Sequence, residues 1–123
     1  MGGGMLSGEG PLFRQVADRV AQDILNGTYP EDTGVPSTNE YALFYQISPI
    51  TVAKGLNLLI EQGMLYKRRG IGMFVAPGAR EHLRATRRAV FRDQHVMALL
   101  QEADLLGIEH SEVVQMIIQE GSQ

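Results

Sequence analysis

The chain contains no cysteine, which excludes structural disulfides and cysteine-ligated metal sites and is compatible with a reducing compartment. No apolar run approaches the roughly 18 residues that a membrane-spanning helix needs, so we expect no membrane segment. The first basic residue is Arg14, and no long apolar stretch lies near it, so we expect no secretory signal peptide. These absences predict a cytoplasmic protein that has no membrane partner.

Signatures of catalysis and of metal binding are absent as well. The sequence has no Gly-x-Ser-x-Gly motif, no nucleotide-phosphate loop and no paired acid and base. Its histidines, His82, His95 and His110, are scattered and do not stand beside a cluster of carboxylates. We therefore expect no enzyme, no metal site and no cofactor.

Charge is unevenly distributed along the chain, although the net charge is only −3. Residues 1–53 hold two basic and six acidic side chains, residues 54–92 hold nine basic and two acidic, and residues 93–123 hold six acidic and none basic. A block of +7 between two acidic segments is typical of a surface that binds nucleic-acid phosphates. A solvated charged face is the alternative, and the motif beside the block favours the phosphate-binding surface.

Two helices are predicted upstream of the basic block. Apolar residues at every fourth position, followed by Asn-Gly, indicate a helix over 11–26: Leu12, Val16, Val20 and Ile24. A loop rich in proline, glycine and acidic residues comes next. Ser37 and, three residues later, Glu40 have the spacing of a capping box, which predicts a short helix over 38–45.

A third helix and a hairpin follow. Ser48 caps this helix, Pro49 occupies its first turn, where a missing N–H costs nothing, and Gly63 ends it. Its expected buried stripe is Val52, Leu56, Leu59 and Ile60. Glycines suit the tight turn of a hairpin between apolar runs 64–66 and 73–75: Lys67-Arg68-Arg69-Gly70-Ile71-Gly72. This order of a helix, a turn, a helix and a basic hairpin predicts that one element lies in a DNA groove and another contacts the phosphate backbone of the DNA.

Residues 78–123 predict a helical tail. Pro77-Gly78 marks a hinge, a long helix follows over 80–106, and Gly107 separates it from a short helix that begins at Ser111. These helices have more apolar surface than a solvated tail needs and too little chain for a core of their own. We expect a second copy of the chain to cover the following residues: Val96, Leu99, Leu100, Ala103, Leu106, Val113, Val114 and Ile117.

Several stretches between Pro11 and Val75 resemble the N-terminal domain of GntR-family bacterial transcriptional regulators. They are Pro11-Leu12-Phe13-Arg14-Gln15-Val16, Val35-Pro36-Ser37 with Glu40 and Ala42, Ile47-Ser48-Pro49-Ile50-Thr51-Val52, Leu59-Ile60-Glu61-Gln62-Gly63-Met64 and Arg68-Arg69-Gly70-Ile71-Gly72-Met73-Phe74-Val75. Because little chain follows the hairpin, the sequence resembles the short YtrA-type subgroup. In that subgroup two C-terminal helices dimerise the protein, and its members often repress their own operons and nearby transporter genes.

The resemblance implies a mostly α fold of the α+β winged-helix type. A flexible leader over 1–10 would precede a three-helix domain with a small β-hairpin wing over 11–77, and a two-helix dimerisation tail would occupy 78–123. The implied function is that of a transcriptional repressor, a homodimer that binds a palindromic operator in double-stranded DNA.

The expected DNA-binding surface combines the wing with the N-terminal residues of both helices of the helix-turn-helix. Helix N-termini bind phosphates, an exposed isoleucine packs on a thymine methyl group, and basic residues flank a groove. The residues expected to do this are Ser37, Thr38, Asn39, Ser48, Pro49, Ile50, Thr51, Lys54, Arg68, Arg69, Gly70 and Gly72, with Lys67 beside them. A helix cap or a solvated side chain is the alternative role for each.

Three DNA-facing positions depart from the common family pattern. Asn39 and Pro49 stand where arginine is usual, and Ala53 stands where arginine or another polar residue is frequent. The absence of arginine at these positions removes candidates for bidentate guanine contacts. We therefore expect an operator unlike the family consensus and an affinity that depends more on phosphate contacts and DNA shape.

The role of an arginine stripe is left open by the sequence. It recurs every four residues with one arginine beside it: Arg80, Arg84, Arg88, Arg92 and the adjacent Arg87. The stripe either extends the phosphate contact or pairs with acidic residues of the same or a partner chain, such as Asp104, Glu109 or Glu112.

Two other functions also stay open. A winged-helix module that binds protein instead of DNA fits the missing arginines and the acidic tail. A sensor with a small-molecule effector pocket near the tail is compatible with the repressor function.

Overall fold

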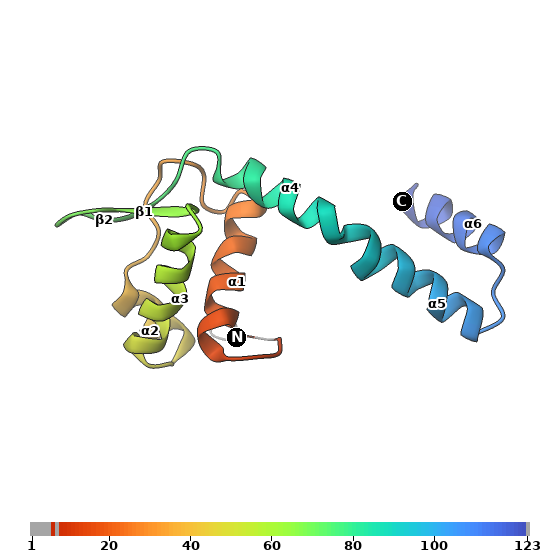
Figure 1. Ribbon diagram of the computed structural model, residues 1–123, viewed down its shortest axis with the longest axis horizontal. Coiled ribbons are helices and arrows are strands. Elements are labelled where there is room, and N and C mark those ends of the chain that lie inside the picture. The colour runs from red at the N-terminus through yellow and green to blue at the C-terminus, as the bar shows by residue number, and fades with distance from the viewer. Residues whose placement is uncertain (1–5, 7, 123) are drawn as a thin grey trace. The chain divides into compact units, whose positions relative to one another are not determined.

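The structure is a computed structural model that describes residue 6 and residues 8–122 (Figure 1). It divides into two compact units, one that ends at Arg84 and one that begins at Ala85. The first unit contains three helices, a two-stranded antiparallel hairpin and the start of a fourth helix: α1 (Leu12–Leu25), α2 (Thr38–Tyr45), α3 (Pro49–Glu61), β1 (Leu65–Arg68), β2 (Gly72–Val75) and α4 (Ala79–Phe91). This is the winged-helix arrangement that the sequence predicts.

Side-chain caps set the starts of α2 and α3. The Glu40 backbone N–H donates to the Ser37 hydroxyl at 3.1 Å, and the Ser37 N–H donates to the Glu40 carboxylate at 2.8 Å. These reciprocal bonds satisfy two N–H groups that the helix leaves unpaired. The Ser48 hydroxyl accepts from the Ile50 N–H at 3.2 Å, with Pro49 as the first residue of α3. Both predicted helix starts are therefore confirmed.

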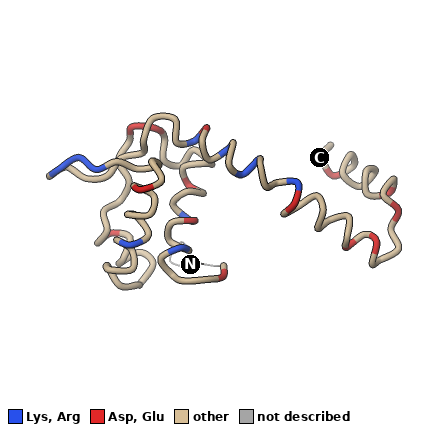
Figure 2. Tube along the Cα trace, viewed as in Figure 1, with Lys and Arg blue, Asp and Glu red and all other residues tan. Residues whose placement is uncertain are grey.

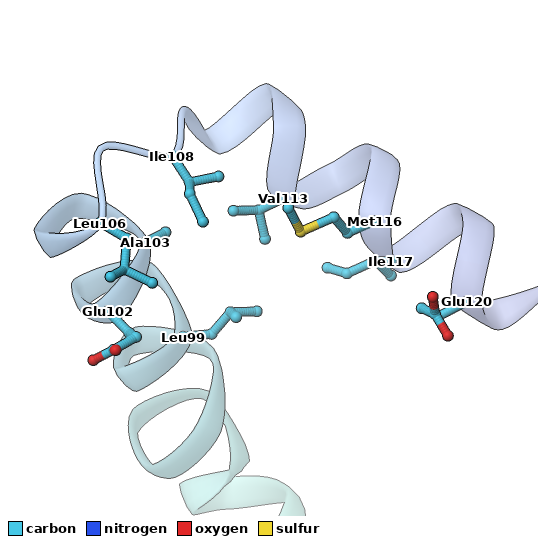
Figure 3. Close-up of a pocket in the computed structure, with 9 residues that line it drawn as sticks. All are labelled: Leu99, Glu102, Ala103, Leu106, Ile108, Val113, Met116, Ile117 and Glu120. Carbon is cyan, nitrogen blue, oxygen red and sulfur yellow. The ribbon is translucent and has the colours of Figure 1, made fainter.

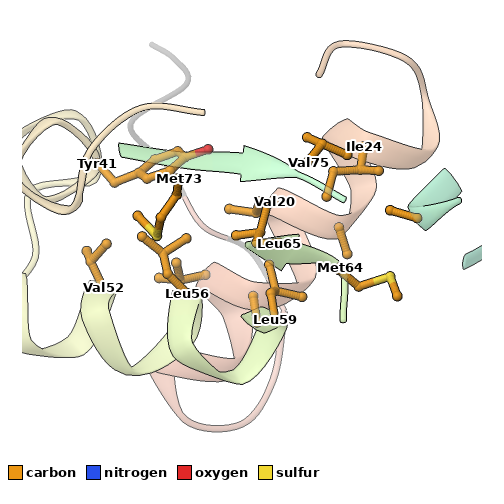
Figure 4. Close-up of a cluster of buried hydrophobic side chains, with 14 of the residues drawn as sticks. Val20, Ile24, Tyr41, Val52, Leu56, Leu59, Met64, Leu65, Met73 and Val75 are labelled. Atoms are coloured by element: carbon orange, nitrogen blue, oxygen red, sulfur yellow. The ribbon is translucent and has the colours of Figure 1, made fainter. Parts of the chain in front are cut away.

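The core of the first unit lies between α1, α3 and the hairpin, with α2 against one side (Figure 4). Its largest fully buried side chains are Ile24, Leu56, Leu59, Leu65, Val16, Val20, Val52 and Val75. Two residues of the predicted stripes are less buried than expected. Leu12 is 48% exposed, and Ile60 is only partly buried. The apolar face of α1 instead includes Ala17 and Ala21, whose small side chains let neighbouring elements approach.

The hairpin is longer than its apolar residues suggested. Strand pairing runs from Leu65–Val75 to Arg68–Gly72, so only residues 69–71 form the turn. The loop before α2 also bonds to β2, because the Val35 N–H donates to the Met73 carbonyl at 2.9 Å and the Val75 N–H donates to the Thr33 carbonyl at 3.0 Å. These bonds occupy an edge that a two-stranded sheet would leave open.

The first unit extends beyond Pro77, where the sequence predicts its end. Ala79 is buried in the core, and the Arg80 Nε–H donates to the Leu25 carbonyl at 2.9 Å. Arg80 thus satisfies a carbonyl at the C-terminus of α1. Arg84 lies 3.5 Å from Glu81, its neighbour on α4. Neither of these two contacts is with the acidic residues of the tail that the sequence offered as partners.

The second unit consists of the end of α4, a π-helical segment η1 (Arg92–Val96), α5 (Met97–Leu105) and α6 (His110–Gly121). The long helix expected over 80–106 is present as α4, η1 and α5, which follow one another without a gap from Ala79 to Leu105, and its backbone widens at η1. The Ile108 N–H donates to the Ala103 carbonyl at 2.8 Å, and His110 Nε2 lies 2.9 Å from the Asp104 carboxylate. These bonds join the end of α5 to the start of α6.

The predicted leader over 1–10 lies largely outside the described residues. Within it, Leu6 packs against the core of the first unit, and the Gly10 carbonyl accepts from Gln15 Nε2 at 2.9 Å. Over residue 6 and residues 8–122, the helices are too short or too polar to cross a bilayer.

Candidate nucleic-acid interface

The start of α2 and the hairpin line an open surface hollow of about 460 Å³. Residues that lie far apart in the sequence meet here: Val35, Ser37, Thr38, Asn39, Glu40, Lys67, Arg68, Gly70, Ile71, Gly72 and Met73. Figure 2 shows basic residues at the free end of the hairpin. The structure thus brings together two of the three segments that the sequence assigns to DNA binding.

The turn of the hairpin exposes its backbone and one apolar side chain. Gly70 and Gly72 have φ angles of 77° and 146°, which side chains other than glycine rarely adopt. Between them, Ile71 is 71% exposed. Sequence reasoning did not assign Ile71 to the site, although an apolar residue between two turn glycines was a usable signal.

Arg68 is held against the aromatic side chains of the hairpin. Its guanidinium carbon lies 5.0 Å from the ring centre of Phe74 and 5.9 Å from that of Tyr66. The two rings stack on each other at 5.8 Å. Both rings are only partly buried, and one face of the pair supports a cation.

The exposed side of α3 presents a mixed surface. Ile50 is 81% exposed and Lys54 is exposed, whereas Thr51 and Ala53 are half-buried. Beside them lies a second hollow of about 500 Å³, lined by Phe13, Ile50, Ala53, Lys54, Asn57, Leu58 and Glu61. The sequence assigned Ile50, Thr51 and Lys54 to DNA binding but not Phe13, which α1 contributes.

Ser37 and Ser48 perform the structural role that the sequence gave as their alternative. Each hydroxyl accepts a hydrogen bond from the first turn of its own helix. A serine hydroxyl keeps further capacity for hydrogen bonding, and exposure of both residues leaves it open to a phosphate.

Two tyrosines of α2, Tyr41 and Tyr45, are core residues. Burial raises the pKa of Tyr41 above its usual value of 10.0, and the neighbouring Tyr29 raises it further. Burial also raises the pKa of Tyr45. Burial thus extends the pH range over which both phenols stay neutral, and their rings stack with centroids 5.9 Å apart. Among the described residues, no three of the types His, Cys, Asp and Glu come together as a metal site.

The second unit has an apolar groove between α5 and α6, with a volume of about 290 Å³ (Figure 3). It is lined by Leu99, Glu102, Ala103, Leu106, Ile108, Val113, Met116, Ile117 and Glu120. Ala103 and Val113, which the sequence offered to a partner chain, are 3% and 4% exposed because α5 and α6 pack on each other there. The other predicted dimer residues keep accessible surface.

The chain matches the family of bacterial regulatory proteins named the gntR family over residues 12–75. The HTH-type transcriptional repressor NagR of Bacillus subtilis (strain 168) is 36% identical over 66 residues, which are 54% of this chain and 27% of NagR. The chain therefore spans about a quarter of the length of such curated relatives.

Two solved structures are similar to this chain, one over nearly all of it and one over more than half of it. A protein from Bacteroides thetaiotaomicron, described as a transcriptional regulator of the GntR family, is 33% identical with a TM-score of 0.69, and the match covers 90% of this chain and 96% of that one. AraR(DBD), solved in complex with operator ORX1, is 30% identical with a TM-score of 0.55 and covers 58% of this chain and 93% of that one.

The relatives are transcriptional regulators, which confirms that the chain is not an enzyme. The family match covers more than half of the chain, and the Bacteroides structure matches nearly all of it. The chain belongs to the GntR family of bacterial transcriptional regulators.

Proposed function

We propose that this protein is a transcriptional repressor that binds a palindromic operator as a homodimer. One observation supports the proposal most strongly. The start of α2 and the glycine turn of the hairpin line one hollow that contains Lys67 and Arg68, although about thirty residues of chain separate the two segments. AraR(DBD), which shares this fold, was solved in complex with operator DNA.

Each element has a role that follows from its geometry. The recognition helix, α3, enters the major groove with its N-terminal residues toward the base edges, where the exposed Ile50 packs on a thymine methyl group. The hairpin approaches the minor groove, because Gly70 has no side chain to hold the backbone away. Arg69 reaches the groove or its phosphates from the same turn.

Affinity then depends mainly on phosphates. Asn39, Pro49 and Ala53 provide no guanidinium group for a bidentate guanine contact. When the remaining lysine and arginine side chains bind phosphates, condensed counterions leave the DNA, so affinity falls steeply as salt concentration rises.

The second unit supports homodimerisation. Soluble monomers rarely expose contiguous apolar patches of more than a few hundred Å². Here the large apolar side chains that remain exposed include Val96, Leu99, Leu106, Val114, Met116, Ile117 and Ile118. A second copy of the same unit would cover them, and a two-fold axis predicts operator half-sites about 10 base pairs apart or a multiple of this.

The dimer is tested with Ile117→Glu, which puts a carboxylate into the apolar face that includes the α5–α6 groove. We expect sedimentation equilibrium to show a monomer for this variant and a dimer for the parent protein. Gln115→Glu adds the same charge at an exposed polar position of α6 and should remain dimeric. A dimeric Ile117→Glu variant would refute this interface.

An apolar effector is the competing occupant of the groove. The groove volume of about 290 Å³ lies near the lower end of ligand pockets, which run from about 300 to 1,000 Å³. Its ionisable lining residues are Glu102 and Glu120. If an effector rather than a second copy occupies the groove, the parent protein sediments as a monomer.

DNA binding is tested by fluorescence anisotropy with the duplex upstream of the protein's own gene, at about 50 and 200 mM salt. We expect binding that loses ten-fold or more in affinity over this range and that exceeds binding to a scrambled duplex. Weak binding that is equal on both duplexes would favour the protein-binding module instead.

A further inference from the structure

The backbones of α1 and α3 approach each other so closely at Gly55 that no side chain fits between them. A Cβ atom on Gly55 would lie 2.6 Å from the Phe13 carbonyl oxygen and 3.1 Å from the Val16 Cβ. This contact fixes the first turn of α1 beside the exposed side of α3. The side chain of Phe13 is therefore held at the edge of the recognition helix.

The ring of Phe13 is close to two cations from different helices. The Lys54 ammonium, on α3, lies 4.3 Å from the ring centre, and the Arg14 guanidinium carbon, on α1, lies 5.4 Å from it. Both distances are within the range of cation–π attraction, which acts on the negative face of an aromatic ring. The ring thus restricts where two long and otherwise flexible side chains place their charges.

Neither cation is neutralised within the part of the chain that the structure describes. Arg14 and Lys54 form no ion pair there, and Glu61, which lines the same hollow, pairs with neither. Two like charges held near one ring repel each other, and an anion between or beside them would relieve that repulsion. The hollow that includes Phe13 and Lys54 also includes Ile50, at the start of the recognition helix.

We propose that Arg14 and Lys54 bind backbone phosphates beside the recognition helix and that Phe13 positions the Lys54 ammonium for this contact. This inference rests on the proposed DNA-binding function and adds to it a contact from α1. Arg14 has donors arranged to bind one phosphate in a bidentate manner, while Lys54 acts as a point charge. Phe13 is a positioning residue that touches no DNA.

The phosphate contact is tested through the salt dependence of DNA binding. The probe is a duplex that the parent protein selects from a random pool, and affinity is measured at several salt concentrations. Arg14→Gln and Lys54→Met should each lower the slope of log affinity against log salt by about 2 for a dimer on its operator, because each substitution removes about one phosphate contact per protomer. Arg19→Gln is the matched control, since Arg19 lies on the same helix but pairs with Asp23 at 3.4 Å, and it should leave the slope unchanged.

The positioning role is tested by a double-mutant cycle. Phe13→Leu keeps an apolar side chain but loses the aromatic face, so we expect it to weaken binding about two- to five-fold in the parent background. In the Lys54→Met background the same substitution should have no further effect, since the residue it positions is gone. Phe13→Tyr keeps the aromatic face and should bind as the parent does. A purely structural role for Phe13 would weaken binding equally in both backgrounds.

A substitution on the wing, Arg69→Ala, distinguishes a failure of this inference from a failure of the proposed function. If Arg69→Ala lowers the salt slope whereas Arg14→Gln and Lys54→Met leave it unchanged, DNA binding stands and the α1 contact is refuted. If the parent protein selects no duplex from the pool, the proposed function itself fails. Equal weakening by Phe13→Leu in both backgrounds refutes the positioning role alone.

Discussion

Replacement of Gly55 by alanine tests the packing of α1 on α3. The added Cβ would lie 2.6 Å from the Phe13 carbonyl oxygen, which belongs to the backbone, and 3.1 Å from the fully buried Val16. Overpacking of this kind costs about 3 kcal/mol at the upper end of its range, because neither neighbour can rotate away. Alanine recovers about 1 kcal/mol of helix propensity relative to glycine. The net expectation is a loss of about 2 kcal/mol in the free energy of unfolding.

This loss is measured by urea unfolding at a fixed protein concentration, followed by circular dichroism. A loss of about 2 kcal/mol should lower the melting temperature of a unit of this size by about 8–16 °C and leave the urea m-value unchanged. Asn57→Ala, at an exposed position of the same helix, gains propensity without crowding and should be neutral or slightly stabilising. A Gly55→Ala protein as stable as its parent would show that α1 moves freely, and it would contradict the rigid placement of Phe13.

Three further predictions concern single contacts. Ser37→Ala should lower the free energy of unfolding by about 1 kcal/mol because it removes the side-chain acceptor of the capping box. Ser37→Asp should preserve stability, and an alanine variant as stable as the parent protein would contradict the cap. Arg80→Met should destabilise the protein by about 1.5–3 kcal/mol, since it removes a charged donor from the Leu25 carbonyl. The same substitution should leave the salt slope of DNA binding unchanged, and a reduced slope would show that Arg80 binds phosphate instead. The raised pKa of Tyr41 means that the unfolded chain releases its phenol proton near pH 10.0 while the folded chain retains it, so stability is intact below that pH and falls above it. Tyr41→Phe should weaken this alkaline loss in melting curves recorded from pH 9 upward, and an unchanged alkaline midpoint would contradict the burial argument.

The sequence by itself determines most local structure of the first unit. The starts of α2 and α3 are predictable because serine caps, a proline at the first helical position and a glutamate three residues after a cap act within one helical turn. The wing is predictable because Gly70 lies in its turn and Gly72 directly follows the turn. The charge distribution and the family resemblance together indicate DNA binding before any contact is known.

Only the tertiary structure decides contacts between segments that lie far apart in the chain. Periodicity does not reveal that Phe13 meets Lys54, or that Arg80 reaches back to the end of α1, because both depend on how two helices pack. The same reason explains Ala103 and Val113, which are apolar at suitable positions for a dimer but are buried by the neighbouring helix of their own unit. The sequence thus determines which faces are apolar or charged, and packing determines which of those faces remain available to DNA or to a second copy.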